Sequence, residues 1–280
     1  MHCDTACRCF EEEKSFLDDS LAVTPKKAAY LKEWHQCFAI FVRDDTKNPY
    51  SYYRAMLDSF KAELENPPDN LTPYFTLEGA SLIDSADKVC CLKNDGIRAV
   101  TLTWNGENKL AGGKDSDKAL TLLGREVIRG LNKNRIFTDL SHLNEKSFYG
   151  AIEEALYPIA THSNCRALCD SKRNLTDEQI RLIAERQGLI GLCFYPDFLN
   201  GEPFEAIYQN IYHLLSLGCE NSIAIGSDFD GGEMSKSLDG IDKLSALYSF
   251  LEKRGLQKEL LYKIFYANAL KCFDKTITMI

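Results

Sequence analysis

Ile136-Phe-Thr-Asp-Leu-Ser141 and Pro158-Ile-Ala-Thr-His162 are two short, largely apolar stretches with the helical pattern of Asn144–Leu156 between them. Short apolar runs of this kind are typical of strands buried on both faces of a sheet. The order strand, helix, strand predicts a unit whose two strands run parallel. Repetition of this unit along the chain decides the fold.

Six further stretches have the same strand-like character. They are Met1–Thr5, Cys37–Arg43, Tyr74–Glu78, Ala99–Thr103, Leu189–Phe194 and Ser222–Asp228. Helical patterns separate most of them. These cover Tyr50–Asn66, Asp84–Asn94, Ala119–Asn132, Thr176–Gln187, Pro203–Gly218, Ile241–Arg254 and Gln257–Phe273. Eight strands and about eight helices predict an α/β fold, a single (β/α)₈ TIM-type barrel domain over residues 1–280, with an open doubly wound sheet as the alternative.

Composition excludes several classes of function. The formal net charge of -8 argues against binding to the nucleic-acid backbone. The sequence lacks a run of 18 apolar residues, so it predicts no membrane span. It also lacks the positively charged and then apolar segment of a secretion signal at its start. Eleven cysteines, an odd number, favour a reduced pool in which most act as small apolar fillers. We therefore expect a cytoplasmic protein.

Polar residues occupy the carboxyl ends of several predicted strands. His2 and Asp4 stand two residues apart on the first strand, so strand alternation directs both side chains into the barrel. The other strand-end residues are Glu78, His142, His162 and Asp228. Because barrel strands converge on one mouth, where active sites lie, we expect these side chains to meet there.

Imidazole and carboxylate groups are ordinary zinc ligands, so this set predicts a site for two zinc ions. Glu78 has two oxygens and is the natural bridge between the metals. A single histidine at a strand end is more often a hydrogen-bonded core residue than a metal ligand. This structural interpretation stays open for each of the histidines taken separately. His35 and His213 lie away from the predicted mouth, and we expect structural roles for both.

Seven short motifs resemble those of the membrane (renal) dipeptidase family, the M19 metallopeptidases, in family order. They are His2-Cys-Asp4, Leu77-Glu-Gly79, Thr101-Leu-Thr-Trp-Asn105, Asp139-Leu-Ser-His142, Thr161-His-Ser163, Lys172-Arg-Asn-Leu-Thr-Asp177 and Gly226-Ser-Asp-Phe-Asp-Gly231. The resemblance covers nearly the whole chain. It implies an amidohydrolase-like barrel and a zinc-dependent dipeptidase, in which a metal-bridged hydroxide attacks the peptide bond of a dipeptide.

The resemblance also implies particular roles. His2 and Asp4 would bind one zinc, His142 and His162 the other, and Glu78 would bridge the two. These assignments agree with the set expected from the strand ends.

The family's substrate-binding residues are also matched in part. Arg173 matches the arginine that binds the substrate carboxylate, a group that a guanidinium holds in two-pronged fashion. Asp228 would handle a proton of the departing amine or anchor the free amino group of the substrate. Trp104 stands where the family dipeptidases have a histidine that supports the oxyanion. Its indole offers one N–H donor and no charge, so we expect it to form an apolar pocket wall or to replace that histidine in part.

Two other functions stay open. The chain could be a binuclear metallohydrolase of another small amide, lactone or ester, or a catalytically weak metal-binding homologue. The substrate's side chains and stereochemistry are not readable from the sequence, and a homodimer is the family's expectation. Only Met1 precedes His2, so we expect either a short first strand or a chain start upstream.

Overall fold

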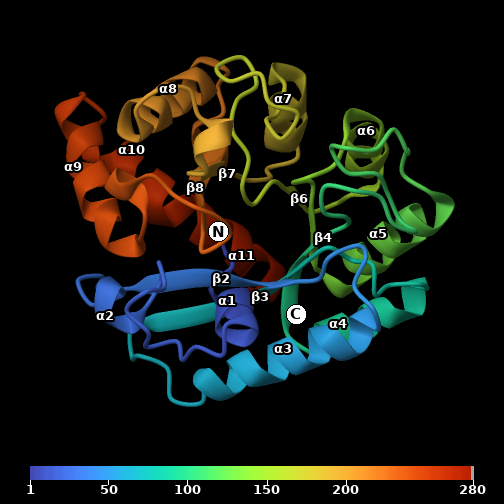
Figure 1. Ribbon diagram of the computed structural model, residues 1–280. Coiled ribbons are helices and arrows are strands. Elements are labelled where there is room, and N and C mark those ends of the chain that lie inside the picture. The colour runs from blue at the N-terminus through green and yellow to red at the C-terminus, as the bar shows by residue number, and fades with distance from the viewer. Residues whose placement is uncertain (279–280) are drawn as a thin grey trace.

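The computed structural model describes residues 1–278, and side chains up to Phe273. Within this part of the chain, eight strands alternate with helices that stand around them (Figure 1). The strands are β1 (His2–Cys3), β2 (Trp34–Phe41), β3 (Leu71–Glu78), β4 (Ile97–Thr101), β5 (Phe137–Asp139), β6 (Pro158–Ile159), β7 (Ile190–Cys193) and β8 (Ile223–Phe229). Each of the eight predicted stretches therefore contains or overlaps a strand.

The strands form two parallel ladders that together make the barrel wall. One ladder has the order β2-β3-β4-β5-β6 and the other the order β1-β8-β7. The pairing of Ala160 with Ile190 joins them at β6 and β7, where the Ala160 N–H donates to the Leu189 carbonyl over 2.8 Å. At the remaining seam, between β1 and β2, no ladder forms among the described residues. The Cys3 Sγ instead donates to the Cys37 carbonyl over 3.4 Å.

The first strand is shorter than the prediction of Met1–Thr5. It ends at Cys3, and Asp4 caps a helix that begins at once with Thr5. This helix, Thr5–Glu11, was not predicted, because its seven residues are too few to show a helical pattern. The second strand begins earlier than expected, at Trp34, because its amino end pairs with Leu71 on β3.

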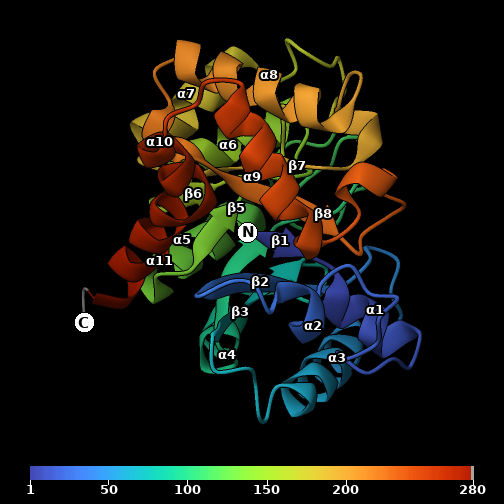
Figure 2. The same cartoon turned by 90° about the vertical axis from the view of Figure 1, so that its left-hand side faces the viewer.

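The helices lie outside the strands (Figures 1 and 2). They are α1 (Thr5–Glu11), α2 (Pro25–Ala28), α3 (Pro49–Glu63), α4 (Val89–Asn94), α5 (Leu122–Asn134), α6 (Glu145–Glu154), α7 (Asp177–Glu185), α8 (Pro203–Ser216), α9 (Leu244–Lys253), α10 (Lys258–Tyr262) and α11 (Asn268–Thr278). The predicted capping box is present at α7, where Thr176 and Gln179 satisfy each other's backbone N–H groups. A π-helical turn, η6 (Lys263–Ala267), interrupts the predicted helix Gln257–Phe273.

The apolar core has two layers. A large layer lies between the strands and the surrounding helices. A smaller cluster gathers Cys37, Ala99, Phe137 and Ile159 from four strands with Phe273 of α11. Phe273 lies 5.0 Å from the Phe137 ring and 5.1 Å from the Tyr74 ring, measured between centroids. Among residues 1–278, no helix is long and apolar enough to cross a membrane.

Candidate active site

All six strand-end residues singled out by the sequence meet at one end of the barrel. Glu78 is the last residue of β3, and Asp228 lies one residue before the end of β8. His142 and His162 each follow their strand, β5 or β6, by three residues. Every one of the six is buried or nearly so, which places the donor atoms away from bulk water.

Glu78 stands at the centre of this group. Its Oε1 lies 2.9 Å from Nε2 of His142 and 3.7 Å from Nε2 of His162. Its other oxygen, Oε2, lies 3.4 Å from Nε2 of His2. The two oxygens of one carboxylate therefore face different imidazoles.

His2 joins this group to a second one on the β1 and β8 side. Its Nε2 lies 3.2 Å from Oδ2 of Asp4 and 3.6 Å from Oδ1 of Asp228. Ligand-type atoms of His2, Asp4 and Asp228 all lie within 4.8 Å of one another, as do those of His2, Glu78 and His162. The geometry thus adds Asp228 to the candidate metal ligands, a place that the sequence reasoning did not give it.

Backbone strain accompanies several of these residues. His142 has φ 70°, and Ser227 and Asp228 have φ 61° and 74°. These left-handed conformations are unfavourable for residues with a Cβ and concentrate at functional sites. They turn the His142 and Asp228 side chains out of the strand direction and toward the common centre.

Each histidine on the β5 and β6 side has a hydrogen-bond partner on its second ring nitrogen. Nδ1 of His142 lies 3.0 Å from Oδ1 of Asn105, and Nδ1 of His162 lies 2.8 Å from Oγ1 of Thr161. Such contacts fix the ring orientation and leave Nε2 facing the centre of the site, where it could bind a metal.

The buried carboxylate of Asp139 organises the same region. It accepts hydrogen bonds from the hydroxyls of Thr101 (2.7 Å) and Thr161 (2.6 Å). It also accepts from the backbone N–H groups of Ser141 and Thr161. Asp139 therefore ties β4, β5 and β6 together directly beneath the two histidines. Sequence reasoning placed Asp139 and Asn105 inside family motifs but gave neither a role.

The charges of the site shift several pKa values in the metal-free protein. Burial opposes protonation of His2, but the carboxylates of Asp4 and Glu78 outweigh it and raise the pKa of His2 well above its usual value. Burial and the nearby Arg173 lower the pKa of His142 to about 4. Burial, followed by the charge of His2, lowers the pKa of His162 well below its usual value. His142 and His162 are therefore neutral at pH 7, the form that binds metal.

The pKa values of the carboxylates also shift in opposite directions. Burial opposes ionisation of Glu78, but His2 and His142 together lower its pKa well below the usual value. Burial raises the pKa of Asp4 to about 7, and it also raises the pKa of Asp228. Burial of the three acids together thus opposes their simultaneous ionisation in the metal-free protein, and a bound cation would favour it.

A cavity of about 480 Å³ opens onto these residues. Arg173 lies in its wall, is 4% exposed, and has its guanidinium 5.2 Å from the centre of the Phe198 ring. One Nη2 donates to the His162 carbonyl over 3.1 Å, but Nε has no hydrogen-bond partner among the described residues. A buried guanidinium with an unused donor is suited to an anionic ligand.

Trp104 forms another part of the cavity wall. Its ring centroid lies 5.5 Å from that of Phe41 and 6.4 Å from that of His142. The guanidinium of Arg43 lies 6.0 Å from the same ring. Trp104 therefore stands beside the candidate metal ligands, packed between aromatic neighbours.

The two remaining histidines lie outside the site, as expected. His35 is on β2 with Nδ1 3.1 Å from the Tyr74 hydroxyl, and His213 pairs with Asp177 over 2.8 Å. The eleven cysteines are all free. Cys193 lies in the site, where its Sγ donates to Oδ2 of Asp228 over 3.4 Å.

A parallel barrel with histidines and carboxylates gathered at its carboxyl mouth defines the class of metal-dependent hydrolases. The chain belongs to the membrane dipeptidase family (peptidase family M19), whose family model matches residues 51–279. By family it is a metallo-dipeptidase. The matched range begins after His2 and Asp4, so it includes Glu78, His142 and His162 but not the first pair.

Individual relatives are similar over about two thirds of this chain. An uncharacterized protein in the pqqA 5′ region of Klebsiella pneumoniae is 33% identical over 192 residues, 63% of this chain and 71% of that protein. An uncharacterized dipeptidase of Schizosaccharomyces pombe is 30% identical over 192 residues, 65% of this chain and 47% of that protein. The chain thus spans about half the length of the second relative.

Solved structures share the fold. The dipeptidase AC, an M19 metallopeptidase, superposes with a TM-score of 0.90 at 23% identity, covering 98% of this chain and 97% of that one. A Rhodobacter sphaeroides metallopeptidase, liganded with a phosphinate mimic of the dipeptide L-Ala-D-Ala, superposes with a TM-score of 0.90 at 22% identity. The coverage of both chains is the same as for the first structure. At these identities the likeness is one of fold.

Proposed function

We propose that the chain is a zinc-dependent dipeptidase that holds two zinc ions, with Glu78 bridging them. The position of the Glu78 carboxylate carries this proposal. One of its oxygens faces His142 at 2.9 Å, and the other faces His2 at 3.4 Å. A bridging ligand needs two oxygens directed at two separate sets of donors.

The surrounding donors fit this metal. Imidazole nitrogens and carboxylate oxygens suit zinc, and every member of the two donor groups around His2 is buried except Asp228, which is half-buried. His142 and His162 would complete one zinc site, and His2 and Asp4 the other. When bound, the two zinc ions would polarise the scissile carbonyl and acidify a water molecule.

Arg173 would bind the carboxylate of the dipeptide. Its unused Nε and its burial beside Phe198 favour an anion at this place. A carboxylate held there would set the register of the substrate across the cavity. Positioning of this kind lowers the entropy cost of reaching the transition state.

Asp228 would manage protons at the opposite end of the substrate. Its Oδ1 faces His2 at 3.6 Å, and its Oδ2 accepts from Cys193. From there the carboxylate would take a proton from the attacking water and deliver it to the nitrogen of the departing amine. The same carboxylate offers an anchor for the free amino group of the dipeptide.

Metal analysis combined with a peptidase assay tests the proposal. Purified protein should contain two zinc ions per chain and should cleave L-Ala-L-Ala or L-Ala-D-Ala, because the Rhodobacter sphaeroides protein binds a mimic of the latter. Chelator treatment should remove both metal and activity, and added zinc should restore them. Undiminished cleavage by zinc-free protein would overturn the proposal.

A second candidate rests on Trp104. Without a charged donor at this position, the cavity would favour another small amide, lactone or ester whose carbonyl needs less support. Arg173→Ala separates the two candidates. If the chain is a dipeptidase, this substitution should abolish the turnover of dipeptides. If the second candidate holds, the substitution should leave the turnover of a neutral ester intact.

The remaining expectations belong to this proposal. We treat residues 1–280 as one domain that acts on small substrates, with no nucleic-acid or membrane partner. A cytoplasmic location and a homodimer are retained from the sequence and family expectations. Size-exclusion chromatography with light scattering tests the homodimer.

A further inference from the structure

The turn at the end of β8, residues 227–231, carries Asp228 and lies against the first strand. Three of its residues have a left-handed backbone, with φ of 61° at Ser227, 74° at Asp228 and 66° at Asp230. Such conformations are unfavourable for residues with a Cβ and persist only where the surrounding structure holds them. The contacts that hold this turn therefore decide where the Asp228 carboxylate lies.

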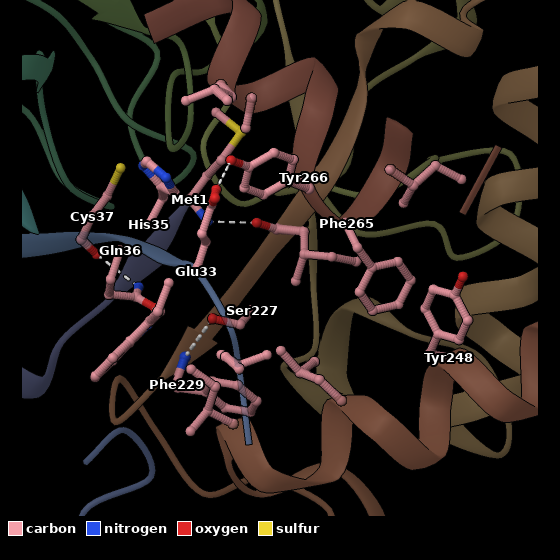
Figure 3. Close-up of a pocket in the computed structure, with 18 of the residues that line it drawn as sticks. Met1, Glu33, His35, Gln36, Cys37, Ser227, Phe229, Tyr248, Phe265 and Tyr266 are labelled. Atoms are coloured by element: carbon pink, nitrogen blue, oxygen red, sulfur yellow. Dashed lines mark hydrogen bonds between the residues drawn. The ribbon is translucent and has the colours of Figure 1, made fainter. Parts of the chain in front are cut away.

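Backbone and hydroxyl groups join the turn to the segment that carries His2 and Asp4. The Ser227 hydroxyl donates to the His2 carbonyl over 2.7 Å. The same oxygen accepts from the Phe229 N–H over 3.4 Å, a bond that the close-up in Figure 3 shows. One step further along, the Asp4 N–H donates to the Phe229 carbonyl over 2.8 Å. The two segments therefore run side by side through the site, and each carries candidate metal ligands.

Asp230 adds a contact through a carboxylate that has no exposed surface. Its Oδ2 accepts a hydrogen bond from the Thr5 hydroxyl over 2.6 Å, and its Oδ1 accepts from the Ala22 N–H over 2.8 Å. Oδ1 also lies 3.7 Å from Nη1 of Arg8. Hydrogen bonds to a carboxylate are stronger than those between neutral groups. One side chain thus joins the turn to the start of α1 and to the loop before α2.

The turn also lies directly against the Asp4 carboxylate. A Cβ on Gly231 would stand 2.5 Å from Oδ2 of Asp4 and 2.9 Å from Oδ1 of Asp228. Asp4 is the N-cap residue of α1, but its side chain makes no capping hydrogen bond, so the helix does not fix its direction. A shift of the turn would therefore move Asp228 and press on Asp4 at the same time.

We propose that Asp230 is a positioning residue for the half of the metal centre that contains His2 and Asp4. It holds Thr5, and with it Asp4, in place against the turn that carries Asp228. Asp4 and Asp228 both face Nε2 of His2, at 3.2 Å and 3.6 Å. Because both oxygens of Asp230 are already hydrogen-bonded, it acts on the centre through these two carboxylates.

The other half of the centre has separate supports. Nδ1 of His142 contacts Asn105, and Nδ1 of His162 contacts Thr161. Loss of Asp230 should therefore weaken one of the two zinc sites and leave the other intact. A general loss of stability would not select between the two sites. The inference rests on the proposed function, since it takes these donors to hold two zinc ions.

Four variants of the full chain separate the hydrogen bonds from the charge. Asp230→Ala removes both hydrogen bonds, and Thr5→Val removes one of them. Asp230→Asn retains both, because its amide oxygen can accept from the Ala22 N–H and its NH₂ can donate to the Thr5 hydroxyl. Thr5→Ser retains the hydroxyl.

The measurement is zinc stoichiometry and affinity, by metal analysis and by competition with a chromogenic chelator. Asp230→Ala and Thr5→Val should bind one zinc as tightly as the parent protein and the second about 10–100-fold more weakly. Asp230→Asn and Thr5→Ser should bind both zinc ions much as the parent does. If Asp230→Ala does not fold, Thr5→Val and Thr5→Ser provide the same comparison.

Asn268→Ala is the matched control. The Asn268 NH₂ donates to the carbonyls of Glu220 and Ile223, each over 2.9 Å, at the opposite end of β8. This variant should have a lower Tm but should retain both zinc ions at the parent's affinity.

Three results would overturn the inference. One is unchanged binding of both zinc ions by Asp230→Ala and Thr5→Val, and another is an equal weakening of both sites. The third is an equal effect of Asp230→Ala and Asp230→Asn, because charge and not hydrogen-bond geometry would then be responsible. A parent protein that binds fewer than two zinc ions would instead overturn the proposed function, and this inference with it.

Discussion

Gly79 lies so close to the backbone of Val42 that a Cβ on it would stand 2.1 Å from the Val42 carbonyl oxygen. Its φ of 78° is also unfavourable for any other residue. Glu78 immediately precedes it, and the Glu78 carbonyl accepts a hydrogen bond from the Val42 N–H over 2.8 Å. The turn at Gly79 thus fixes the position of the Glu78 carboxylate relative to β2.

We expect Gly79→Ala to displace Glu78 and to lower both stability and zinc binding. The backbone conformation alone costs about 1–2 kcal/mol, and the clash with Val42 adds to it. Gly96→Ala is the matched control, because Gly96 has φ 85° and nothing within 4 Å of its Cβ position. Urea denaturation and metal analysis of both variants provide the measurement. Similar losses in the two would show that the contact with Val42 has no special role.

Glu78→Gln should weaken both zinc sites together. The amide keeps the shape but removes the charge that His2 and His142 face. We expect zinc affinity to fall by more than the roughly 10–100-fold typical of losing an outer partner. Competition with a chromogenic chelator measures this. Asp95→Asn, at an acid paired with Tyr53 away from the site, is the control. Retention of one tightly held zinc by the Glu78 variant would argue against a bridging role.

Asp139→Asn tests the support beneath the histidines. The substitution places an NH₂ group where hydroxyl or backbone donors now meet a carboxylate, so at least one hydrogen bond is lost. We expect about a 10–100-fold loss of zinc affinity. Thr101→Val removes only one donor and should have a smaller effect in the same assay. A larger effect from Thr101→Val than from Asp139→Asn would contradict this account.

Trp104→His should raise dipeptide turnover. Histidine supplies a donor that can carry a positive charge beside the reacting carbonyl, and one such donor contributes about 10²–10³ in rate. Trp104→Phe keeps the apolar wall and serves as the control. The measurement is kcat for a dipeptide at saturating zinc. Lower kcat in the histidine variant would mean that the indole itself is required.

The pH dependence of stability provides a test of His142 in the metal-free protein. Its folded-state pKa is lowered to about 4, so the unfolded chain binds this proton first as the pH falls. Stability from this group is present above about pH 6.5 and is lost toward pH 4, at up to about 1.4 kcal/mol per pH unit. His142→Gln should remove this contribution in urea denaturation of chelator-treated protein. Identical pH slopes in both proteins would contradict the assignment.

The order of strands and helices was readable from the sequence because each buried strand is a short apolar run. The gathering of Glu78, His142 and His162 followed from their places at strand ends. The boundaries of β1 and α1 were not readable, since tertiary contacts with β8 determine where the first strand stops. The Asp4 N–H, for example, donates to the carbonyl of Phe229, far along the chain.

The residues that hydrogen-bond or support the histidines of the site could not be predicted from the sequence either. Asn105 reaches His142 across 37 positions, and Asp139 accepts hydrogen bonds from Thr101 on β4 and from Thr161, which follows β6. Neither arrangement has a local pattern, because loop conformation brings these groups together. The left-handed backbone of Asp228 had no signal either, although it directs that carboxylate toward His2.

The neighbours β1 and β8 come from opposite ends of the barrel sequence. The hydroxyl of Thr5 donates to Asp230 over 2.6 Å across 225 positions. During synthesis at about 5–20 residues per second, the His2 side of the centre would wait roughly 10–45 s for its partners on β8. Zinc captured before then would meet an incomplete set of ligands. Maturation of this metal centre is therefore expected to follow the synthesis of β8.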